Sequence, residues 1–171
     1  MTTMNMRSCF FDAWKHQAQG LRIILVLGSF ICLYRQALAD DERIYSFGDP
    51  FIQITQGLTE CAMQQPSRFT KAEMLAQAHY RVERGTSCYQ SGQCRLPNSY
   101  LYDKEIIPRV QKALLADGRF LNTSVAVEGQ RRWVTLKGCV QTQEQASSIE
   151  QLVRTIDDVE AVINQLQIIG K

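Results

Sequence analysis

The sequence has few histidines and no strong excess of charge of either sign. Two of the 171 residues are histidine, and 19 lysine and arginine residues are nearly balanced by 17 aspartate and glutamate residues. Proteins that bind nucleic acid through its phosphates normally carry a clear basic excess. The balance of charge therefore argues against nucleic acid as the main partner of this protein.

A long apolar run is also missing. The most apolar stretch, LRIILVLGSFICLY at residues 21–34, is shorter than the roughly 20 residues that a membrane-spanning helix needs. It follows basic residues and is closed by Ala-Leu-Ala at residues 37–39, a small-x-small site of the kind at which signal peptides are cleaved. We therefore expect a secretory signal peptide over residues 1–39, with a retained N-terminal anchor as the alternative.

Removal of this leader would leave a nearly neutral chain, residues 40–171, with an even number of cysteines. Four cysteines would remain: Cys61, Cys88, Cys94 and Cys139. An even number of cysteines in a small exported chain predicts a disulfide framework. Four cysteines allow three fully paired connectivities, and the sequence alone does not choose among them.

The spacing of these cysteines is unlike that of metal and redox motifs. Cys88 and Cys94 lack the C-x-x-C spacing associated with a lowered thiol pKa. Together with Cys61 and His79 they would make a Cys₃His zinc set, but no pair has the short gap of a zinc ribbon, and an oxidising compartment favours disulfides. We therefore expect no metal and no cofactor.

Catalysis by a cysteine is equally poorly supported. His16 would leave with the leader, so His79 is the sole histidine of the predicted mature chain. A Cys/His nucleophile needs a thiolate held by an imidazole and an oxyanion site. His79 lies on a predicted helix, where a surface histidine is the simpler interpretation, and we expect a protein that is not an enzyme.

Residues 40–102 are predicted to form an arm with one helix and a cysteine loop. The first part of the arm lacks sustained periodicity and is expected to be irregular. Thr70 and Glu73 have the spacing of a capping box, so a helix is expected to begin there. Gly85 is expected to end that helix, which places Cys88 and Cys94 in a loop over residues 85–100.

The rest of the chain alternates between helical and strand patterns. A helix is predicted over residues 103–118, a hairpin with its turn at residues 128–130, a second helix after Thr142, and a closing strand over residues 159–169. The fold class is therefore α+β, with an αββαβ order in which two helices pack on one face of a three-stranded sheet.

Three segments in this order resemble the BON domain, a small module of bacterial envelope proteins. They are DKEI at residues 103–106, VTLKGCV at residues 134–140 and VEAVINQLQI at residues 159–168. Gly138 and Val140 stand at the family's Gly-x-Val. The resemblance gives a BON-like domain over residues 103–171 and leaves the arm outside it.

One position departs from the family pattern. Where the family usually has Gly-Val, this chain has Asp158 and Val159, at the turn into the last strand. Because aspartate tolerates turn conformations, we expect a shifted turn and the same fold.

The resemblance implies a non-enzymatic periplasmic protein, peripheral to the outer membrane, that binds phospholipid surfaces or envelope components and supports envelope integrity. It also leaves a second interpretation, an adaptor subunit of a multiprotein envelope complex such as a secretion assembly. In that case residues 40–102 would be the partner-specific part. The oligomeric state stays open.

Strand parity adds two hypotheses about the face of the sheet that the helices leave open. Alternation sends Trp133, Lys137 and Cys139, together with Arg131, to that face. Arg131, Trp133 and Lys137 would suit the headgroup level of an anionic bilayer, unless Trp133 packs under the arm.

The second hypothesis concerns Cys139. An exposed free cysteine would be a liability in an exported protein, so we expect Cys139 to pair with a cysteine of the arm and to pin the arm across this face. A local bridge between Cys88 and Cys94 is the simpler alternative for those two cysteines.

Overall fold

The computed structural model describes residues 42–169, so the predicted signal peptide lies outside the described residues. The described part contains helices α2 (Lys71–Gln90), α3 (Asp103–Asp117) and α4 (Gln143–Arg154), a short 3-10 helix η2 (Ser99–Leu101), and strands β1 (Phe51–Gln53), β2 (Ser124–Gln130), β3 (Trp133–Val140) and β4 (Ala161–Ile168). Within this part, no helix has the length and apolar character needed to cross a membrane.

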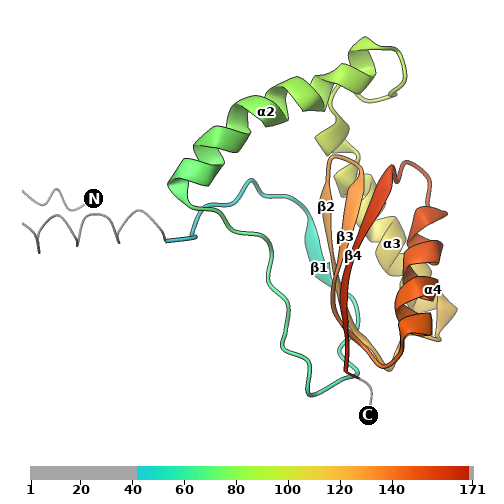
Figure 1. Ribbon diagram of the computed structural model, residues 1–171. Helices are drawn as coiled ribbons and strands as arrows, with labels where there is room; N and C mark the ends of the chain where they lie inside the picture. Colours follow the sequence, from blue (N-terminus) through green and yellow to red (C-terminus); the bar gives the residue numbers. More distant parts are fainter. Residues whose placement is uncertain (1–41, 170–171) are drawn as a thin grey trace, which may run out of the picture. The chain divides into compact units, whose positions relative to one another are not determined.

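The strands form one sheet in the order β1-β2-β3-β4. β2 is antiparallel to both β1 and β3, whereas β4 runs parallel to β3, with α4 as the crossover between them. Helices α3 and α4 cover one face of the sheet (Figure 1). The αββαβ order is thus present, as expected.

The expected three-stranded sheet needs one correction, because the arm adds a fourth strand. β1 pairs along β2, with Phe51 opposite Glu128 and Gln53 opposite Ala126. The sequence did not predict β1, because its three residues are too few to show the alternation typical of a strand. The strand forms by pairing with the edge of β2, which lies far away in the sequence.

The helix in the arm begins where its capping box predicts and ends later than expected. The Thr70 hydroxyl accepts from the amide of Glu73, and the Glu73 carboxylate accepts from the amide of Thr70. The helix passes through Gly85 to Gln90, and Gly85 is buried against the side chain of Asn98, where a Cβ would lie 2.8 Å from two atoms. The close approach of Asn98 explains why this position is a glycine. Because the helix continues to Gln90, Cys88 lies on the helix and not in the predicted loop.

The hairpin turn also lies later than predicted. β2 continues through Gln130, and the turn consists of Arg131 and Arg132, with φ of 56° and 68°. Asp158 has a φ of 71°, consistent with the expectation that aspartate would tolerate the turn before β4.

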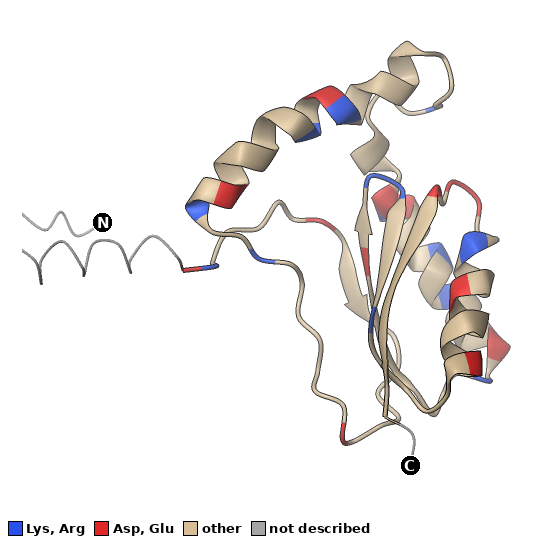
Figure 2. Ribbon diagram, viewed as in Figure 1, with Lys and Arg blue, Asp and Glu red and all other residues tan. Residues whose placement is uncertain are grey.

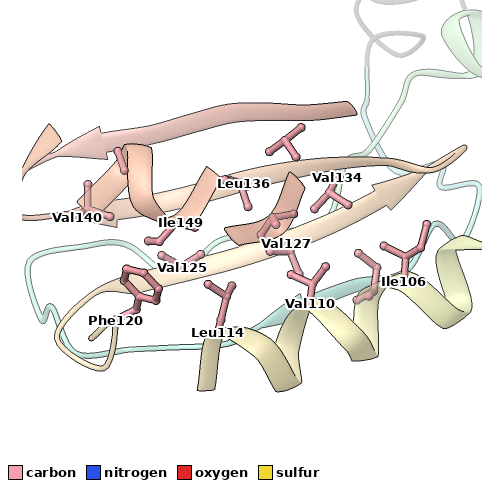
Figure 3. Close-up of a cluster of buried hydrophobic side chains, with 14 of the residues drawn as sticks. Ile106, Val110, Leu114, Phe120, Val125, Val127, Val134, Leu136, Val140 and Ile149 are labelled. Atoms are coloured by element: carbon pink, nitrogen blue, oxygen red, sulfur yellow. The ribbon is translucent and has the colours of Figure 1, made fainter. Parts of the chain in front are cut away.

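The core fills the space between the two helices and the sheet (Figure 3). Its members are apolar side chains at helical spacing on α3 and α4 and at alternate positions on β2 and β3, namely Ile106, Val110, Leu114, Val125, Val127, Val134, Leu136, Val140, Ile149 and Val153. Val140 of the predicted Gly-x-Val pair is fully buried in this core.

Gly138, the other residue of that pair, is required by the backbone. Its φ is 114°, and a Cβ at this position would lie 2.0 Å from the carbonyl oxygen of Ser124 on the neighbouring strand. Only glycine tolerates this conformation and this closeness of β2 and β3.

Candidate binding surface

The arm covers part of the sheet face that lies opposite α3 and α4. Cys61 of the arm and Cys139 of β3 form a disulfide, which is the arm-to-domain pairing that the pinned-arm hypothesis expects. Ser67 donates from its amide and its hydroxyl to the Glu128 carboxylate, at 2.9 and 2.7 Å. In Figure 1 the arm runs on the side of the sheet away from α4.

Lys137 lies beneath this arm and not on an exposed basic surface. Its side chain is 16% exposed, and its ammonium group donates to Glu128 Oε2 and to Ser67 Oγ. The charge of Lys137 is therefore neutralised within the protein. The alternation along the strand predicted the correct face of the sheet for Lys137. It could not show that an acidic partner on β2 lies on the same face.

Trp133 and Arg131 lie together at the end of the same face. The Arg131 guanidinium stands 4.8 Å from the centre of the Trp133 ring, a distance suited to a cation–π interaction. Trp133 is half-buried, and its Nε1 has no hydrogen-bond partner among the described residues. Of the three predicted surface residues, the structure thus brings Arg131 and Trp133 together and separates Lys137 from them.

A buried carboxylate holds the turn between β2 and β3. Asp103, at the start of α3, is 1% exposed and accepts hydrogen bonds from the amides of Arg131 and Arg132, both at 2.7 Å. Burial raises the pKa of Asp103 to about 6, although the two amide donors oppose this shift. These hydrogen bonds fix the backbone from which the side chains of both arginines extend. Figure 2 shows the turn as a basic segment.

Arg132 and Asp103 are absent from the sequence-based site. Arg132 donates from Nε to the carbonyl oxygen of Asp158 at 2.8 Å, and its Nη1 lies 3.4 Å from the sulfur of Cys94. The sequence carries no comparable signal for Asp103, and the turn predicted at residues 128–130 left Arg132 outside the turn that it forms in the structure.

The second disulfide joins Cys88 to Cys94, so the local bridge is the one that forms. It ties the last turn of α2 to the loop that follows. His79 lies on the exposed side of α2, 3.2 Å from Glu83, in agreement with its interpretation as a surface residue.

Helix α2 is anchored to the rest of the arm through Arg81. The guanidinium lies 4.1 Å from the ring centres of both Phe47 and Tyr100 and pairs with the carboxylate of Asp49. On a neighbouring stripe of the helix, Leu75, Val82 and Tyr89 are 67%, 67% and 51% exposed. One side of the helix is therefore fixed and an apolar stripe beside it faces solvent.

Two helices on one face of a small sheet, with a disulfide-linked arm on the other, define an α+β module with a half-buried basic turn. Residues 102–170 match the model of the BON domain, and this part of the chain is a BON domain. The match leaves the arm outside the domain. BON domains are associated with envelope proteins and with phospholipid binding. No curated protein matches the chain.

Proposed function

We propose that the protein is a non-enzymatic envelope protein of the periplasm whose BON domain binds anionic phospholipid surfaces. The observation that carries the proposal is the pair formed by Arg131 and Trp133 at the end of the sheet. Within the described residues, Arg131 forms no ion pair, so its charge remains available to an anion.

The chemistry of the pair suits the boundary between lipid and water. Tryptophan is enriched at the headgroup level of membranes, and each basic residue near an anionic surface adds about 1 kcal/mol of attraction. The two disulfides are consistent with an oxidising compartment such as the periplasm. Lys137 is excluded from the proposed surface because Glu128 already neutralises it.

Vesicle flotation tests this proposal. The protein is expected to float with vesicles that contain phosphatidylglycerol and to stay behind with vesicles of phosphatidylcholine alone. Arg131→Ala should weaken the binding about fivefold, which corresponds to the loss of one surface charge. Arg119→Ala is the matched control, since Arg119 is exposed but paired with Asp117. Equal flotation with neutral and anionic vesicles would contradict the proposal.

A second candidate function, an adaptor within a multiprotein envelope complex, is favoured by the apolar stripe on α2. Leu75, Val82 and Tyr89 recur every seven residues on the solvent side of the helix. An amphipathic helix that lays such a stripe into a groove is a common mode of protein recognition. Absence of flotation, together with a large native complex that Leu75→Ser with Val82→Ser dissociates, would favour this function over lipid binding.

A further inference from the structure

A cleft of about 610 Å³ lies where the C-terminal half of α2 meets the β2–β3 turn. Three arginines line it, Arg84 from α2 and Arg131 and Arg132 from the turn. Glu160 supplies the one carboxylate among its described lining residues. The cleft therefore has a positive balance of charge, and it is built jointly by the arm and the BON domain.

Two of the three guanidinium groups have no acidic partner. Arg84 stacks over Tyr80, with 4.4 Å between the guanidinium carbon and the ring centre, and Arg131 stacks over Trp133. Among the ion pairs of residues 42–169, neither arginine takes part. Stacking orients a guanidinium without using its N–H donors, so both remain able to bind an anion.

Arg132 has a different role in the cleft, because its donors are largely used. Its Nε donates to the carbonyl oxygen of Asp158, and its Nη1 lies 3.9 Å from the Glu160 carboxylate. Glu160 thus offsets the charge of Arg132 and leaves the other two arginines unpaired. The sulfurs of Cys94 and Cys88 lie 3.4 and 3.9 Å from the same Nη1, so the local disulfide forms part of the cleft wall.

The backbone of the turn is a second, independent observation. Arg131 and Arg132 both have positive φ, a conformation that costs a residue other than glycine about 1–3 kcal/mol and that concentrates at functional sites. The buried Asp103 carboxylate accepts from both amides and stabilises this conformation. Two arginines thus occupy a turn that asparagine and glycine would form at lower cost.

We propose that this cleft binds a phosphate-bearing anion, with the phosphate group between Arg84 and Arg131. Guanidinium groups bind phosphate through paired, charge-assisted hydrogen bonds, and the volume falls within the roughly 300–1,000 Å³ of small-ligand sites. The phosphate can belong to a lipid headgroup or to a free phosphorylated small molecule. The headgroup source rests on the proposed function, whereas phosphate binding itself does not.

Titration of the oxidised protein with glycerol 3-phosphate, followed by amide NMR shifts, tests the cleft directly. Resonances of the turn and of the last turns of α2 are expected to shift. Arg84→Ala should weaken binding at least about tenfold, because one charge-assisted contact is lost. Arg119→Ala should leave the affinity unchanged. Arg84 is exposed on a helix, so its replacement leaves the core intact.

The outcomes separate the two sources. Glycerol 3-phosphate binding and vesicle flotation that Arg84→Ala weakens together support a headgroup in the cleft. Glycerol 3-phosphate binding without flotation supports a free phosphorylated ligand and removes the proposed lipid function. No shift at the cleft with millimolar glycerol 3-phosphate, or an equal effect of Arg84→Ala and Arg119→Ala, overturns the inference even if the vesicles bind.

Discussion

Cys61 in the arm is bonded to Cys139 in β3, 78 residues further along the chain. The bond fixes a segment outside the BON domain to the face of the sheet that the helices of the domain leave uncovered. Cys139 is 5% exposed and Lys137 lies on the same face, beside the arm residue Ser67. The arm and the domain therefore share one surface, and changes at that surface affect both.

The two disulfides are expected to differ in their effect on stability. In the chain-entropy model, a bond that closes a loop of 78 residues contributes about 4 kcal/mol, and one that closes a loop of 6 contributes about 2 kcal/mol. Replacement of Cys61 and Cys139 by serine should therefore lower the free energy of unfolding more than replacement of Cys88 and Cys94. Urea denaturation of both double variants measures the difference, and equal losses would contradict it.

Asp103 is expected to make the protein less stable as the pH rises. Its pKa is about 6 in the folded protein and near 3.8 in the unfolded chain, so the unfolded state loses its proton first. The stability that Asp103 contributes is fully present below pH 4, decreases as the pH rises from 4 to 6, and is lost above pH 6. The size of the change is about 3 kcal/mol at most.

The comparison with Asp103→Asn isolates this effect, because asparagine does not titrate. The free energy of unfolding of the wild type, minus that of the variant, should decrease between pH 4 and pH 7 in urea denaturation. A difference that stays constant or increases with pH would show that the buried carboxylate does not titrate in this range.

Lys137 and Glu128 should behave as a buried pair. Lys137→Met leaves the Glu128 carboxylate beneath the arm without its cation, which is expected to lower stability by about 3–5 kcal/mol. The double variant Lys137→Met with Glu128→Gln should lose less than Lys137→Met alone, since no uncompensated charge remains. A double-mutant cycle by chemical denaturation measures this coupling, and additive losses would rule it out.

Gly138→Ala is expected to destabilise the BON domain by about 3 kcal/mol or more, because the new methyl group collides with the Ser124 carbonyl oxygen. Gly48→Ala is the matched control. Gly48 also has positive φ, at 72°, but nothing lies within 4 Å of a Cβ there, and its replacement should cost about 1 kcal/mol. Thermal denaturation of the two variants measures their losses of stability. Similar losses would show that the positive φ, and not the collision with Ser124, causes the destabilisation.

Local patterns were sufficient to predict much of the fold. The capping residues Thr70 and Thr142 begin their helices as expected, because each cap is made within four residues of sequence. The alternation along β3 assigns Leu136 and Lys137 to opposite faces, since that periodicity is intrinsic to a strand. The turn at Asp158 follows from the same kind of local reasoning.

Contacts between distant segments could not be predicted in this way. β1 forms because it pairs with the edge of β2, and Gly85 packs within α2 against Asn98, which follows the helix. The turn at Arg131 and Arg132 depends on Asp103, which is 28 residues earlier than Arg131. The candidate cleft combines the arm with this turn, and for that reason the sequence indicated Arg131 but neither Arg84 nor Arg132.

The order of the four described cysteines along the chain has a consequence for biogenesis. The bond from Cys61 to Cys139 encloses the bond from Cys88 to Cys94, so the inner bond joins successive cysteines and the outer bond does not. A polypeptide that enters an oxidising compartment N-terminus first presents Cys61 and Cys88 together before either native partner arrives. Oxidation of successive thiols during translocation would trap the wrong pair, and correct maturation then requires an isomerase or a delay until Cys139 has emerged.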